Sequence, residues 1–169
     1  MLGFFLKLKK ATIISLPTLL IILFTFFNII ISKNFFDFGV LIALHGIFFW
    51  FLYTPNLLPP LIILILGLFH DIIYLLPLGS TSLIFLFVLV LIKIFKELFL
   101  NPSFFEIWIS FSVIFSICIF CFWFLISLIN FVILPIMPIF FKIYINLIFF
   151  PISYIIFYFI LTKLKLEKF

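Results

Sequence analysis

The stretch that decides the fold class is EIWISFSVIFSICIFCFWFLISLIN, residues 106–130, in which the only charged residue is the first. A helix that crosses a bilayer needs about 20 predominantly apolar residues. This run is long enough to cross, and its polar positions hold serine, cysteine and tryptophan rather than charges. We therefore predict a membrane helix over residues 106–130.

Composition extends this prediction to the whole chain. Of the 169 residues, 69% are hydrophobic and 9% are charged, whereas a soluble domain is about half apolar and a quarter charged. The length suits one domain and leaves almost nothing for a second, water-soluble one. We expect an all-α integral membrane protein in which residues 1–169 form a single polytopic membrane domain.

The apolar runs predict about six transmembrane helices in one bundle. Pro77 with Gly79 beyond it is expected to end the third helix, and Pro151 to interrupt the sixth. The second and third runs are short, so they could instead form one re-entrant hairpin, which would leave four spanning helices; five is another alternative. The predicted helices cover residues 11–32, 38–53, 57–76, 81–99, 106–130 and 139–161.

Lysine placement predicts the orientation. With six helices, both chain ends share one side of the membrane, and that side carries most of the lysines, whereas Lys33 and Lys142 fall on the other. The positive-inside rule then places both termini in the cytoplasm. The lysines flank apolar runs instead of clustering on a solvated face, which argues against a nucleic-acid partner. The lysine-rich side holds Lys7, Lys9, Lys10, Lys93, Lys96, Lys163, Lys165 and Lys168.

The sequence carries few signs of catalysis. It has no Gly-rich phosphate loop, no H-E-x-x-H and no G-x-S-x-G, and its carboxylates are scattered instead of paired. Cys118 and Cys121 form a CxxC inside an apolar run, where two small core residues are a better interpretation than a redox pair or half a zinc site. We expect no enzymatic activity, no cofactor and no metal.

Four polar residues fall in the outer half of the six-helix arrangement when each is placed by the helical rise of about 1.5 Å per residue. They are Asn28, His45, Asp71 and Asn146. Helices two and three are antiparallel neighbours in this arrangement, so Asp71 is expected to meet His45. A ligand or proton site is one interpretation. A structural hydrogen bond between helices is the favoured one, because no second acidic residue lies nearby.

Gly67, Asp71 and Tyr74 follow the spacing i, i+4, i+7 and are predicted to share one side of the third helix. Gly67 would let another backbone approach closely, and Asp71 could accept a hydrogen bond from that neighbour. His70 is rotated by about 100°, so it is not expected to form a dyad with Asp71. The predicted structural or partner-contact motif is Gly67, Asp71, Tyr74, Pro77, Leu78 and Gly79.

This segment resembles the signature of the bacterial rod shape-determining protein MreD family, and chain length, predicted helix count and the place of the segment agree with it. The motif covers about 17 residues, 67–83. The chain departs from the family pattern at Tyr74, Leu75 and Leu76, where the family has small residues, so the turn is bulkier. The residues that carry the resemblance are Gly67, Asp71, Leu78, Gly79, Ser82 and Leu83.

The resemblance implies a multi-pass scaffold of the cell-elongation machinery in the bacterial cytoplasmic (inner) membrane. Such a protein would work with membrane lipid around it and with MreC, MreB, RodA and the penicillin-binding transpeptidase of RodA, and would maintain rod shape by organising peptidoglycan synthesis. The family is also similar in fold to the substrate-binding membrane subunits of energy-coupling-factor vitamin transporters. That role is the alternative, and a membrane-embedded enzyme is a distant third.

Overall fold

The computed structural model describes residues 15–26, 42–98 and 102–163, and within these ranges the chain is helical with no strand. The all-helical prediction is therefore confirmed for this part of the chain. A short 3-10 turn, η1 (Pro55–Leu57), joins α2 to α3. The α-helices are Ser15–Phe26, α2 (Ile42–Tyr53), α3 (Pro60–Ile73), α4 (Ser80–Leu98), α5 (Phe104–Asn130) and α6 (Met137–Lys163).

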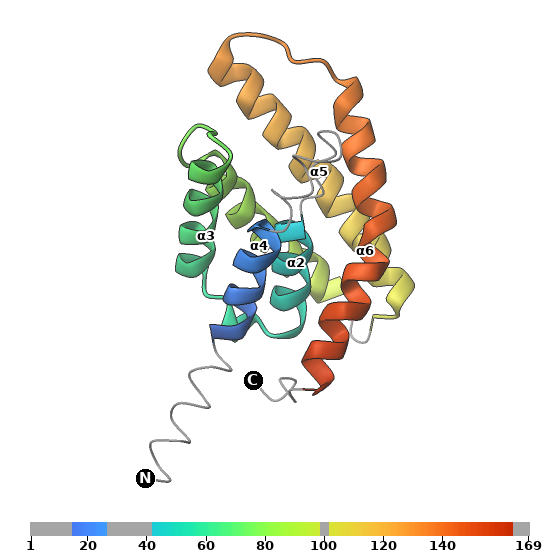
Figure 1. Cartoon of the computed structure of the whole chain (residues 1–169). Helices are drawn as coiled ribbons and strands as arrows, with labels where there is room; N and C mark the ends of the chain where they lie inside the picture. Colours follow the sequence, from blue (N-terminus) through green and yellow to red (C-terminus); the bar gives the residue numbers. More distant parts are fainter. Residues whose placement is uncertain (1–14, 27–41, 99–101, 164–169) are drawn as a thin grey trace, which may run out of the picture.

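Successive helices run up and down the molecule (Figure 1). Ser15 and Lys163, the first and last described residues, lie at one end, which we call the near end. The α3–α4 and α5–α6 turns lie at the opposite, far end. This arrangement brings α3 against α4, α4 against α5, α5 against α6, and α2 against both α4 and α6.

Helix α2 forms the interior of the bundle. Every residue from Ala43 to Trp50 is buried, as expected for a helix that is hydrophobic on all sides. Its Phe48 packs edge-on against Phe111 of α5 and Phe150 of α6, and those two rings stack with their centroids 3.9 Å apart. Aromatic rings from α2, α5 and α6 therefore meet in the interior of the bundle.

The far ends of α3 and α5 terminate in the same way. Leu75 and Phe131 both adopt the left-handed conformation, with φ of 52° and 53°, a position that glycine usually fills. The N–H of the next residue then bonds back to Asp71 O in α3 and to Ser127 O in α5. Helix α3 ends at Ile73 for this reason, so the prediction that Pro77 and Gly79 end it is wrong.

Helix α6 runs through Pro151 without a break, which contradicts the predicted interruption. Proline lacks an N–H, so the carbonyl four residues earlier, that of Leu147, has no helical donor. The Trp108 indole Nε1 of α5 donates to this carbonyl at 3.1 Å. An indole from the neighbouring helix thus replaces the missing backbone donor.

Among the helices that the structure describes, α5 and α6 are long and apolar enough to cross a membrane, with 27 residues each. Helices α2 and α3 have 12 and 14 residues, which is about 18 and 21 Å at the helical rise. Both are shorter than a hydrocarbon core of roughly 30 Å.

Candidate functional site

Asp71 is the centre of a buried hydrogen-bond network at the far end. Its Oδ2 accepts from the Gly79 N–H at 2.7 Å. Its Oδ1 accepts from the Ser80 hydroxyl at 3.1 Å, and from the N–H and hydroxyl of Thr81 at 3.0 and 2.5 Å. All four donors belong to the beginning of α4, so the carboxylate of α3 is fully engaged by its neighbour.

The local sequence explains why α4 needs this carboxylate. Helix α4 begins at Ser80, which makes Gly79 its N-cap, and the Gly79 carbonyl accepts from Leu83 N–H. An N-cap side chain normally accepts a hydrogen bond from the second or third N–H of the helix, but glycine has no side chain. Asp71 supplies that acceptor from α3, at the end of α4 where the helix dipole favours acceptor groups.

Gly67 permits the close contact that this capping requires. A Cβ at Gly67 would lie 2.4 Å from the Cα of Ser82, so the predicted close backbone approach is confirmed. The Ser82 hydroxyl donates to Leu64 O at 3.0 Å, and the Thr81 hydroxyl lies 2.7 Å from Gly67 O. We call this set the α3–α4 joint; it consists of Gly67, Asp71, Gly79, Ser80, Thr81 and Ser82.

The remaining motif residues lie outside the joint. Tyr74, which was predicted to share one side of the helix with Asp71, is the C-cap of α3 and stacks on His70, with ring centroids 4.3 Å apart. Pro77 accepts only from Ser80 N–H through its carbonyl, and the Leu78 and Leu83 side chains are exposed.

His45 has partners other than the predicted Asp71. Its Nδ1 lies 2.9 Å from the Ser153 hydroxyl of α6, and the Asn146 side chain approaches the same ring. The rings of Phe111, Phe115 and Phe150 surround it edge-on.

The prediction of a single outer-half cluster is therefore wrong for Asp71, while His45 and Asn146 do come together. Asn28 lies outside the described residues. Two groups of partners were missed from the sequence. The hydroxyl run Ser80–Ser82 after Gly79 is a visible signal of a helix start, whereas nothing in the sequence marks Ser153.

The CxxC residues lie in the packed part of α5. Both thiols are free, with Cys118 buried and Cys121 half-buried. Among the described residues, no three His, Cys, Asp or Glu side chains gather as a group that could hold a metal ion.

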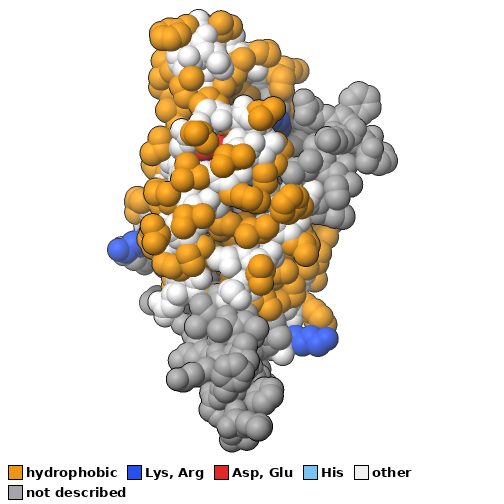
Figure 2. Space-filling view, turned by 60° about the vertical axis from the view of Figure 1, so that its left-hand side comes forward, with side chains coloured by type: hydrophobic (Ala, Val, Ile, Leu, Met, Phe, Trp, Pro, Cys, Tyr) orange, Lys and Arg blue, Asp and Glu red, His pale blue; other side chains and the backbone are white. Residues whose placement is uncertain are grey.

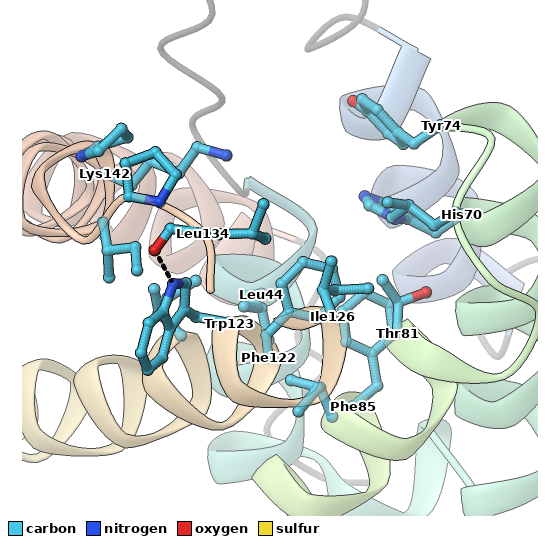
Figure 3. Close-up of a pocket in the computed structure, with 16 residues that line it drawn as sticks. Leu44, His70, Tyr74, Thr81, Phe85, Phe122, Trp123, Ile126, Leu134 and Lys142 are labelled. Atoms are coloured by element: carbon cyan, nitrogen blue, oxygen red, sulfur yellow. Dashed lines mark hydrogen bonds between the residues drawn. The ribbon is translucent and has the colours of Figure 1, made fainter. Parts of the chain in front are cut away.

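A cavity of about 450 Å³ opens at the far end, between the α3–α4 turn and the α5–α6 hairpin. Figure 3 shows His70 and Tyr74 on one wall and Trp123, Leu134 and Lys142 on the opposite one. Its lining is apolar except for His70, Tyr74, Thr81, Lys142 and the indole N–H of Trp123. We call it the far-end pocket; it is also lined by Leu44, Leu76, Ile84, Phe85, Ile119, Phe122, Ile126, Pro135, Pro138 and Ile139.

Comparisons with known proteins give no match: no family model, no curated protein and no solved structure is similar to this chain.

Proposed function

We propose that this protein is embedded in a membrane and acts there as a non-catalytic scaffold of the MreD type. The membrane part of the proposal is supported by the molecular surface. In the most apolar 18-residue segments of α5 and α6, only 22% and 17% of the residues are buried. The core helix of a soluble protein is mostly buried. Apolar side chains cover most of the surface seen in Figure 2, with lysines at its margins, and soluble monomers rarely expose apolar patches of that size.

The proposed orientation has the near end in the cytoplasm. The described helices alternate in direction, as six crossings would require, and the lysine bias favours the cytoplasm for the side with both chain ends. The shortness of α2 is compatible with this arrangement. Because Ala43–Trp50 is enclosed by other helices, α2 contacts protein rather than lipid and need not match the bilayer thickness.

The scaffold proposal is supported mainly by the composition of the α3–α4 joint and by the internal hydrogen bonds of Asp71. Four residues that carry the MreD resemblance, Gly67, Asp71, Gly79 and Ser82, lie together in it. The Asp71 carboxylate accepts four hydrogen bonds within the chain, so it is committed to structure instead of to a reaction. The departures from the family pattern do not disturb the joint, since Leu75 is 93% exposed and Tyr74 packs on His70.

In this role the protein would hold MreC, MreB, RodA and the penicillin-binding transpeptidase in one assembly during side-wall synthesis. The test is depletion of the protein in the bacterium that encodes it. We expect rods to become round and to recover when the wild-type chain is restored. Asp71→Ala should restore shape poorly, and Glu106→Ala, at an exposed helix cap, should restore it fully. Rods that keep their shape after depletion would overturn the proposal.

The far-end pocket favours the alternative, a substrate-binding subunit of an energy-coupling-factor-type vitamin transporter. Ligand sites of 300 to 1,000 Å³ are common in proteins, and this cavity is in that range. Its lining offers few hydrogen-bonding groups for a vitamin, which is why the alternative ranks second. The transporter alternative would be favoured if depleted cells remained rods but took up less vitamin. A neighbouring gene pair for ATPases would also favour it.

A further inference from the structure

The walls of the far-end pocket are apolar enough to accommodate a hydrocarbon chain. Most of its walls are aliphatic or aromatic, and two of the polar groups on its lining are already used. The Trp123 indole donates to Leu134 O at 3.1 Å, as the dashed line in Figure 3 marks. The Thr81 hydroxyl belongs to the α3–α4 joint. A ligand with many hydrogen-bonding groups would find few partners here.

One polar group on the lining has capacity for a ligand. His70 is 4% exposed and its Nδ1 is enclosed by protein, so it contributes a wall of the pocket rather than an open donor. Lys142 is exposed, and no described carboxylate pairs with it.

The position of the pocket fits a lipid. It lies at the far end, next to the link between α5 and α6, where Phe131 and Ile133 are almost fully exposed. In the proposed orientation this level is the outer boundary between hydrocarbon and headgroups. A chain that enters from the bilayer would meet apolar walls, and its headgroup would remain at the level of Lys142.

We propose that the far-end pocket binds one hydrocarbon chain of an anionic lipid, whose headgroup is recognised by Lys142. The cation gives charge complementarity to the headgroup, and the aliphatic and aromatic walls bury the chain. This inference goes beyond the scaffold role and shares only the membrane placement with it. A protein that fails to bind lipid here could still maintain cell shape, and the depletion test separates the two.

The experiment is native mass spectrometry of the full chain, released from detergent that contains equal amounts of phosphatidylglycerol and phosphatidylcholine with identical acyl chains. We expect one retained phosphatidylglycerol per chain. Because a lysine near a membrane surface contributes about 1 kcal/mol toward an anionic lipid, Lys142→Gln should reduce its preference over phosphatidylcholine by about fivefold. Ile126→Trp, which fills the pocket, should abolish retention of either lipid.

Matched controls lie on the same two helices. Lys163→Gln removes an exposed lysine at the near end of α6, and Ile129→Trp adds an indole at an exposed position of α5 outside the lining. Both should retain lipid as the wild type does. Equal loss in Ile126→Trp and Ile129→Trp, or a lipid preference that Lys142→Gln leaves unchanged, would overturn the proposal. Lys142→Gln changes an exposed side chain, so it keeps the test informative if Ile126→Trp misfolds.

Discussion

The α3–α4 and α5–α6 pairs are both antiparallel and both turn at the far end, yet different interactions hold them. The α3–α4 joint is polar, with a buried carboxylate and three consecutive hydroxyl residues between closely packed backbones. The α5–α6 pair is held by stacked rings such as Phe111 and Phe150 and by two indole N–H donors. The α3–α4 pair therefore relies on hydrogen bonds around a buried carboxylate, whereas the α5–α6 pair combines aromatic packing with indole hydrogen bonds.

The two pairs nevertheless solve one physical problem with opposite chemistry. At the start of α4 the unpaired groups are N–H donors, and the Asp71 carboxylate accepts from them. Before Pro151 the unpaired group is the Leu147 carbonyl, and the Trp108 indole donates to it. Backbone groups must be satisfied wherever water is excluded. The comparison teaches that Asp71 and Trp108 both lie where a backbone group would otherwise have no partner.

The largest expected effect comes from Asp71→Ala, which would leave the Gly79 N–H, the Ser80 hydroxyl and the Thr81 N–H without their acceptor, whereas the Thr81 hydroxyl can still donate to Gly67 O. Since each buried donor left unpaired costs about 1 to 3 kcal/mol, we expect the free energy of unfolding to fall by about 3 kcal/mol or more. The measurement is unfolding in detergent followed by tryptophan fluorescence. The control is Glu106→Ala, which breaks the exposed capping box with Ser103 and should cost about 1 kcal/mol. Equal losses would contradict the special role of the buried carboxylate.

Gly67→Ala should follow in size. Its Cβ would meet the backbone of Ser82 at 2.4 Å, so the two helices must separate, at about 2 kcal/mol for overpacking. Gly46→Ala is the matched control because its Cβ would meet a side-chain atom, Cγ1 of Ile21, at 3.0 Å instead of a backbone at 2.4 Å. We expect a loss below about 1 kcal/mol there. Thermal unfolding of the two variants side by side checks the difference, and a Gly46 variant that is the less stable one would refute it.

A double-mutant cycle tests the α5–α6 side of the comparison. Trp108→Phe removes the donor to Leu147 O and should cost about 1 to 2 kcal/mol. In a Pro151→Ala background the new Ala N–H can bond to that carbonyl, so the same Trp108→Phe change should cost clearly less. The coupling energy between the two sites is the measured quantity. Additive costs would mean that the indole contributes through packing alone.

The smallest effects are expected at the two left-handed residues of the α3–α4 turn. Gly79 has φ of +93°, and a Cβ there would meet nothing within 4 Å, so Gly79→Ala should destabilise through the backbone alone, by about 1 kcal/mol. Leu75 has φ of 52° and is 93% exposed, so Leu75→Gly should stabilise slightly, by about 0.5 kcal/mol. Melting temperatures in detergent should therefore move in opposite directions. A shift of the same sign in both would contradict this account.

Much of the fold could be predicted from the sequence, because the lengths of the apolar runs determine where helices can form. The predicted helix at 106–130 and the observed Phe104–Asn130 differ by two residues at the start. The end of α3 could not be predicted, since a leucine in a left-handed conformation carries no signal comparable to glycine. The same holds for α6, where the effect of Pro151 depends on an indole from another helix.

Part of the candidate site was predicted from the sequence. A physical reason separates the role that was predicted, that of Gly67, from the partners that were not. The role of Gly67 follows from side-chain size alone, so its spacing to Asp71 was informative. The partner of Asp71 depends on how the turn at 74–79 folds back, and the partner of His45 depends on which face of α6 meets α2. Neither is encoded in the local sequence, and the proposed His45–Asp71 contact failed for that reason.

The capping of α4 by Asp71 has a consequence for how the chain would be made. In a bilayer, α3 alone would carry a carboxylate without donors, and α4 alone would begin with N–H groups without an acceptor. In the proposed membrane placement each helix would remove the other's insertion penalty, so the two would have to leave the translocation machinery together as one hairpin. The aspartate would then set the smallest unit that can enter the membrane during synthesis.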